Sequence, residues 1–343
     1  QMRAAAAAEL AGRVALVILV GLAAWFSWGF YGMLVATTVA NILQLAVALF
    51  AANRMVPIRI RYEPAYWKHI LTLSWPIGVS IAFNLIYLRA DAVILSLTRS
   101  QGELGLYGAA YRVIDVLTVR PFLLMGLGLP RLVAAVKTGD TARFGALMAR
   151  AARFLLAAIL PICFGGLVLA DQVMIAVSGE AFAPSGMFLA VLLFGVAMIF
   201  WGTVYSHAVV ALGLQRTMLP FYALNAALAL VLYIWLIPRF GGPAAAWITV
   251  LSETTIAIAA AVVVRRKMPM PLPLGNATRI ILAAALMAAA LWLTLRTIPL
   301  PLLVSLPLGG LLYAAFLRLT GGLTTEDWRA ILAPFVRNKP VVS

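Results

Sequence analysis

Residues 73–95 read LSWPIGVSIAFNLIYLRADAVIL, a mainly apolar stretch that nevertheless contains Asn84, Arg89 and Asp91. About 20 apolar residues in a helix are enough to span the hydrocarbon core of a bilayer. A charged side chain at that depth costs at least about 2.5 kcal/mol, so it usually faces a protein interior or a water-filled cavity. The stretch therefore predicts a membrane helix with one polar side turned toward protein or water.

The rest of the chain has the same apolar character. Of its 343 residues, 64% are hydrophobic and only 11% are charged, with a mean hydropathy of +1.03. A soluble domain carries about 25% charged residues, so this is the composition of an integral membrane protein. Spanning runs separated by short loops predict an all-α fold with about ten transmembrane helices and no soluble domain. The expected spans are residues 11–29, 32–52, 74–97, 105–129, 147–170, 186–211, 218–237, 243–264, 278–296 and 300–319.

The formal charge of +15 follows the predicted topology. Of the 26 basic residues, 20 lie on one side of the predicted membrane, in the two terminal segments, in every second loop and at the adjoining helix ends. The opposite loops hold only Arg99, Arg239 and Arg296, and three more arginines lie inside helices. By the positive-inside rule, both termini are expected in the cytoplasm. The charge needs no nucleic acid as partner, and it also suits an anionic membrane surface.

Polar residues gather on one side of the predicted helix at 74–97. At 100° per residue, Asn84, Tyr87 and Asp91 lie within about 60° of one another and form a stripe. Arg89 lies about 160° from Asp91, so the two charges point to different faces and do not simply neutralise each other.

The next predicted helix carries further charges. Arg112 and Asp115 are three residues apart, a spacing that lets them pair along one face. Asp91 and Arg112 lie at a similar depth below the connecting loop, about 10 Å, which predicts a contact between the two helices. Arg120 precedes Pro121 and has no acidic residue three or four positions away, so it is a better candidate for binding an anionic substrate.

These charges allow two interpretations. They form either an ion-pair network that only fixes helix packing, or a polar cavity reached from the outer half of the bilayer. Glu253, in the predicted helix at 243–264, is likewise either a proton or cation site or a partner in an interhelical hydrogen bond. No HExxH, P-loop, paired-carboxylate motif or Cys/His cluster occurs in a loop, so we expect no metal, no cofactor and no enzymatic activity.

Three stretches resemble the polysaccharide biosynthesis family of oligosaccharide flippases, within the superfamily that also holds multidrug exporters and lipid II flippases. The first runs from residue 73 to GELGLYGAAYRVID at 102–115, the second is SGEAFAPSGMFLAVLLFG at 178–195, and the third runs from ALGLQRTMLPFYALN to WITVLSE at 211–253. Ala229 departs from the family pattern, because relatives often have a second asparagine there.

The resemblance implies a fourteen-helix fold of two six-helix lobes and a final helix pair, of which this chain lacks the first four helices. Residues 1–73 would then hold the last two helices of the N-terminal lobe and a cytoplasmic linker. Residues 74–264 would form the six-helix C-terminal lobe, residues 265–320 the final pair, and residues 321–343 a cytoplasmic tail.

The implied function is to move an undecaprenyl-diphosphate-linked oligosaccharide across the bacterial inner membrane by alternating access, for O-antigen, capsule or exopolysaccharide assembly. The partners would be this lipid-linked oligosaccharide, membrane lipids and a polysaccharide polymerase. The expected substrate-binding residues are Arg112, Arg120, Arg89, Asn84 and Tyr87, and the expected charge-balancing or ion-coupling residues are Asp91, Asp115 and Glu253. The alternatives are a cation-coupled multidrug exporter, a membrane glycosyltransferase or ligase, and a fragment without function.

Overall fold

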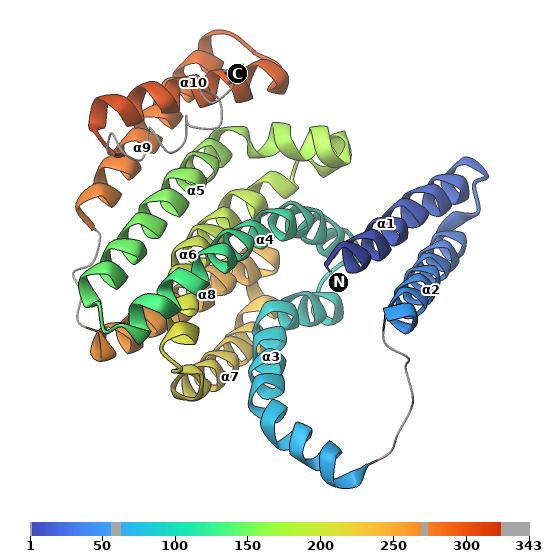
Figure 1. The fold of residues 1–343 in the computed structure, drawn as a ribbon. Coiled ribbons are helices and arrows are strands. Elements are labelled where there is room, and N and C mark those ends of the chain that lie inside the picture. The colour runs from blue at the N-terminus through green and yellow to red at the C-terminus, as the bar shows by residue number, and fades with distance from the viewer. Residues whose placement is uncertain (1, 56–62, 269–273, 324–343) are drawn as a thin grey trace, which may run out of the picture. The chain divides into compact units, whose positions relative to one another are not determined.

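The computed structural model describes residues 2–55, 63–268 and 274–323, and this part of the chain is helical throughout with no strand (Figure 1). Most of the predicted tail at 321–343 lies outside the described residues. The helices are α1 (Met2–Trp25), α2 (Gly29–Met55), α3 (Pro64–Thr98), α4 (Gln101–Lys137), α5 (Thr141–Ser178), the 3-10 helix η1 (Glu180–Phe182), α6 (Ser185–Ala211), α7 (Gln215–Phe240), α8 (Gly242–Lys267), α9 (Leu274–Thr297) and α10 (Leu302–Thr320).

Each predicted span coincides with one α-helix. Within the described residues, eight helices are long and apolar enough to cross a membrane, namely α2 and α4 to α10. The predicted spans at 11–29 and 74–97 are helical in α1 and α3 but are not among these eight. The expected all-helical, multi-pass membrane protein is therefore confirmed.

The chain divides into two compact units, residues 1–73 and 74–343. In the first unit, α1 packs along α2 through small residues. Gly12 lies so close to the side chain of Gln44 that a Cβ at position 12 would come within 2.7 Å of it, and Ala23, Ala36 and Ala40 are buried. Small residues bring membrane helices close enough for van der Waals packing, which replaces the hydrophobic effect inside a bilayer.

Helix α6 forms the centre of the second unit, because it packs against α4, α5 and α8. Small residues again set the closest approach. A Cβ at Gly202 would lie 2.9 Å from the Cβ of Ala257 on α8, and one at Gly195 would contact Val250. Helix α7 packs on α8, while α9 and α10 pack on each other and on α5 (Figure 1). The α5–α10 contact includes a hydrogen bond of 2.8 Å from the Tyr313 hydroxyl to the carbonyl of Ala157.

Helices α4 and α5 each begin at a residue whose side chain caps the helix, and a tight turn joins the end of α4 to the start of α5. The Ser100 hydroxyl caps α4 by accepting the N–H of Glu103 at 3.2 Å, and the Asp140 carboxylate caps α5 by accepting the N–H of Arg143 at 2.8 Å. Gly139 occupies the left-handed region with φ of 68° between the two helices. Such caps satisfy N–H groups that have no partner within the helix.

Candidate functional site

A cavity of about 290 Å³ lies in the second unit between α4, α6, α7 and α8, with one side chain from α3. Its polar lining comprises Arg89, Tyr111, Asp115, Thr118, Thr203, Ser206, Tyr222, Thr249 and Glu253. Exposure falls from Arg89 and Asp115, which are about half exposed, to Thr203 and Glu253, which are buried. The cavity therefore has polar groups along its whole depth, inside helices that are otherwise apolar.

Arg89 and Asp115 form an ion pair between α3 and α4. The guanidinium Nη2 lies 3.3 Å from both carboxylate oxygens, and the guanidinium carbon lies 5.6 Å from the centre of the Tyr111 ring. The expected pairing of Asp115 with Arg112 is wrong, since Asp115 turns toward α3. Arg112 is exposed and does not line the cavity. An ion pair this exposed contributes about 1 kcal/mol or less in water, so its partners can exchange.

Asp91 lies apart from this ion pair, buried with only 1% of its surface exposed. Its Oδ2 accepts a hydrogen bond from the Tyr107 hydroxyl at 2.6 Å, and its Oδ1 accepts the N–H of Ala92 at 2.7 Å. The predicted contact with Arg112 is therefore wrong. Tyr107 occupies the facing position, and Arg112 lies about 140° further around α4. As expected, Arg89 and Asp91 do not pair with each other: Arg89 contacts Asp115 and Asp91 contacts Tyr107, both on α4.

Glu253 projects into the deep part of the cavity from α8 and is 8% exposed. Thr249 lies one turn earlier on the same helix and shares a 3.2 Å hydrogen bond with the hydroxyl of Tyr233 on α7. Among the described residues, no hydrogen bond or ion pair is formed by the Glu253 carboxylate. It is therefore available to a ligand or a cation that enters the cavity.

The remaining predicted residues lie elsewhere. Arg120 is exposed on α4 and donates a hydrogen bond of 3.0 Å to the carbonyl of Val116 in its own helix. It lies about 160° around α4 from the cavity residue Phe122, so it does not line this cavity. The side chains of Asn84 and Tyr87 lie outside the described residues.

Sequence reasoning missed the hydroxyl groups that complete the cavity. Thr203 and Ser206 are three residues apart on α6, and Thr249 and Glu253 are four apart on α8. Both spacings place two polar side chains on one helix face. This spacing is the sequence feature from which a polar lining could have been predicted. Tyr111 and Tyr222 carried no such signal, because aromatic residues are common in packed membrane helices.

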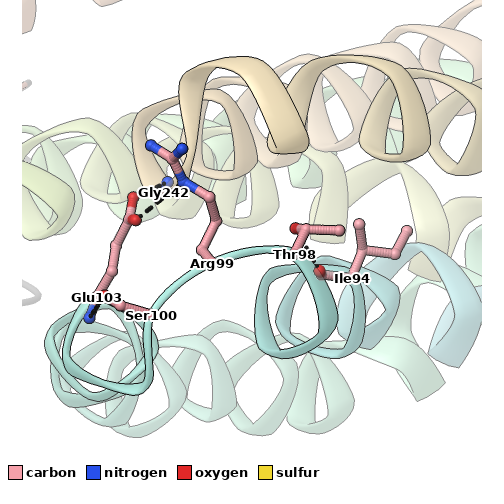
Figure 2. Close-up of polar contacts among 6 residues, drawn as sticks. All are labelled: Ile94, Thr98, Arg99, Ser100, Glu103 and Gly242. Atoms are coloured by element: carbon pink, nitrogen blue, oxygen red, sulfur yellow. Dashed lines mark hydrogen bonds and ion pairs between the residues drawn. The ribbon is translucent and has the colours of Figure 1, made fainter.

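At one end of this unit, Glu103 joins two helix turns (Figure 2). Its Oε2 lies 3.0 Å from Nε of Arg99, and its Oε1 accepts the backbone N–H of Gly242 at 2.7 Å. A carboxylate at the first turn of α8 also meets the positive end of that helix dipole. The α3–α4 turn and the α7–α8 turn are thereby held at the same end of the unit.

No group of three or more His, Cys, Asp and Glu side chains that could hold a metal ion occurs in the described parts of the chain. The cavity contains one cation, two carboxylates and several hydroxyl groups, which suit the binding of a polar or charged ligand. These observations define a polytopic helical membrane protein with a polar cavity inside its helix bundle.

Residues 1–126 match the polysaccharide biosynthesis protein family, which confirms the predicted resemblance over this part of the chain. The match includes the first of the three stretches quoted above, whereas the second and third lie beyond it. The fold is that of a solved structure titled lipid II flippase MurJ, inward closed conformation. The TM-score is 0.73 at 15% identity, over 97% of this chain and 68% of that one. A comparison with curated proteins gave no match.

Proposed function

We propose that the protein is a transporter that moves an undecaprenyl-diphosphate-linked oligosaccharide across the bacterial inner membrane, for O-antigen, capsule or exopolysaccharide assembly. The main observation in support of this proposal is a polar cavity of about 290 Å³ within a fold shared with a lipid II flippase. The match to the polysaccharide biosynthesis family supports the same class of substrate. A polysaccharide polymerase would then use the delivered oligosaccharide.

The two halves of such a substrate need different surroundings. Sugars and a diphosphate require hydrogen-bonding groups, whereas the prenyl chain is stable in an apolar environment. On the other side of α4 and α6 from the polar cavity lies an apolar groove of about 330 Å³, formed with α5, α9 and α10. Leu117, Leu193 and Tyr313 are among the residues that line it. The helix bundle thus offers separate polar and apolar surfaces.

Arg89 is the residue we assign to the diphosphate in this cavity. It is paired with Asp115 through a half-exposed contact that costs little to open, so an incoming diphosphate can replace the carboxylate. Arg112 and Arg120 would contribute from the exposed face of α4, and Asn84 and Tyr87 from α3. Asp91, Asp115 and Glu253 would balance these charges or couple an ion to the alternating-access cycle.

A second candidate function also has support. Of the charged residues that line the cavity, two are acidic and one is basic, and Tyr111, Phe122 and Tyr222 line it too. An acidic, aromatic cavity suits amphipathic cations through charge and cation–π contacts. This favours a cation-coupled multidrug exporter of the same superfamily as the alternative.

Reconstituted transport distinguishes the two candidates. Proteoliposomes containing the protein are given either a fluorescent undecaprenyl-diphosphate oligosaccharide, whose bleaching by external dithionite reports its leaflet, or ethidium under a proton gradient. Flipping of the lipid-linked sugar that falls about tenfold in Arg89→Gln supports the proposal. Ethidium efflux that is lost in Glu253→Gln, without flipping of the lipid-linked sugar, would establish the exporter instead.

A further inference from the structure

A second groove, separate from the polar cavity, lies between α4 and α5 and encloses about 240 Å³. Its apolar part includes Leu124 and Phe154, which are 44% and 45% exposed, and its basic part includes Arg131 and Arg150. All four residues belong to the hairpin in which α4 and α5 meet at Thr138–Asp140. We propose that this groove binds one anionic glycerophospholipid at the cytoplasmic surface.

The position of the groove follows from helix length. Helix α4 has 37 residues and is about 55 Å long, whereas the hydrocarbon core is about 30 Å thick. The short α3–α4 turn brings the start of α4 close to one membrane surface, so the excess length lies at the other end. Counting about 20 residues from Leu104 reaches Leu124 at the edge of the core, and Arg131 lies about 10 Å further on.

Helix α5 gives the same depth from its other end. With 38 residues, it also extends beyond the core, and about 20 residues back from Ser178 lead to Ala158. Phe154 then lies near the edge of the hydrocarbon core, and Arg150 lies about 12 Å beyond Ala158. The apolar part of the groove is thus level with acyl chains, and its two arginines are level with lipid headgroups.

Charge favours an anionic headgroup. Residues 131–153 contain Arg131, Lys137, Arg143, Arg150 and Arg153 but only one acidic residue, Asp140. The guanidinium group is well suited to phosphate oxygens because its donors match their spacing, and basic pockets between membrane helices on the cytoplasmic side bind anionic lipids.

Gly128 keeps the groove open. It lines the groove on α4 between Leu124 and Arg131, and a Cβ at this position would meet no atom within 4 Å. A larger side chain there would occupy the space proposed for an acyl chain. Gly126 has equally open surroundings but does not line the groove, so it provides a matched control.

The test uses native mass spectrometry of the purified protein with phosphatidylglycerol and phosphatidylcholine of identical acyl chains. We expect one phosphatidylglycerol to bind at least about tenfold more tightly than phosphatidylcholine. Arg131→Gln/Arg150→Gln should remove this preference, and Gly128→Leu should weaken binding of phosphatidylglycerol although every charge is kept. Lys137→Gln and Gly126→Leu, which change charge and bulk outside the groove, should bind like the unsubstituted protein.

Equal phosphatidylglycerol binding by Arg131→Gln/Arg150→Gln and Lys137→Gln would overturn the proposal, because the two groove arginines would then contribute no more than a lysine outside the groove. Displacement of the bound lipid by an equimolar amount of undecaprenyl diphosphate would also overturn it, because the groove would then belong to the substrate path. Melting temperatures of all variants are measured in the same detergent. If Gly128→Leu melts like Gly126→Leu and still binds phosphatidylglycerol normally, the groove is not the binding site.

Discussion

The Glu103 carboxylate accepts the backbone N–H of Gly242 at 2.7 Å, across 139 residues of sequence. This bond joins the first turn of α4 to the first turn of α8, and the same carboxylate holds Arg99. Charge-assisted hydrogen bonds contribute about 1.5–3 kcal/mol, and a carboxylate at a helix N-terminus adds about 0.3–1 kcal/mol. Glu103 therefore stabilises the end of the bundle at which these two helices begin.

Replacement of Glu103 by alanine should lower stability, because the N–H of Gly242 and the Arg99 guanidinium both lose their carboxylate partner. We expect a loss of about 1–3 kcal/mol, seen as a lower melting temperature in detergent. Glu180→Ala removes an exposed carboxylate from η1 and is the matched control, with little expected change. Equal melting of the two variants would show that the Glu103 contacts contribute nothing.

A substitution at the neighbouring Gly241 tests the same junction, the contact of Glu103 with Arg99 and Gly242, by changing the backbone position beside it. Gly241 and Gly213 both have positive φ values, of 65° and 68°, and Gly241 combines its φ with a ψ of −146°, a conformation that is essentially restricted to glycine. Only at Gly241 would the added Cβ meet Glu103 and Arg99, whereas nothing lies within 4 Å of a Cβ at Gly213. Gly241→Ala should therefore lower the melting temperature more than Gly213→Ala, and an equal effect would argue against close packing at the junction.

Tyr107 and Asp91, which share a hydrogen bond, should be strongly coupled in their effect on the free energy of unfolding. Tyr107→Phe leaves the buried Asp91 oxygen without its 2.6 Å donor, which should cost about 1–3 kcal/mol of unfolding free energy. In an Asp91→Ala background the same substitution should cost much less, because the acceptor is already gone. A double-mutant cycle of chemical unfolding measures the difference. A coupling energy near zero would contradict this geometry.

Helix positions were predictable from sequence because each span combines an apolar run with charged or turn-forming ends. The true lengths were not, since α4 extends from 101 to 137 whereas the prediction covered 105–129. Hydropathy detects only the part that is apolar. Residues such as Arg131 and Lys137 continue the helix through backbone hydrogen bonds, which a hydropathy pattern does not detect.

The candidate site was predicted less well than the helices. Helical geometry correctly predicted that Arg89 and Asp91 do not pair with each other, because both lie on one helix and their positions around it follow from sequence spacing. Contacts between helices depend on how α3 and α4 rotate about their axes, which sequence spacing does not specify. As a result, Tyr107 rather than Arg112 faces Asp91, and Arg89 rather than Arg112 pairs with Asp115. The expected depth of Arg112 was also wrong, because α4 begins at residue 101 rather than 105, so Tyr107 and not Arg112 lies level with Asp91.

Membrane orientation is a separate prediction from the distribution of charge. Each arginine expected on the outer side has a local contact: Arg99 with Glu103, Arg239 with the Trp235 ring at 4.7 Å, and Arg296 with the Trp292 ring at 3.9 Å. Tryptophan and arginine together are typical of a membrane interface.

Reporter fusions test this orientation. Fusions after Gly102 and Gly179 should report the outer side, and a fusion after Gly139 should report the cytoplasm. The inverse pattern would reverse the orientation and would also place the groove between α4 and α5 on the outer surface.

The most direct test of the polar cavity as the substrate path is to fill it. Thr118 lines the cavity, whereas the adjacent Val119 is exposed and does not line it. The measurement is the initial rate at which each variant flips the fluorescent undecaprenyl-diphosphate oligosaccharide in proteoliposomes. Thr118→Trp should lower this rate at least about tenfold while Val119→Trp, with the same added bulk, retains it. Equal rates in two variants of equal melting temperature would show that the substrate does not pass through this cavity.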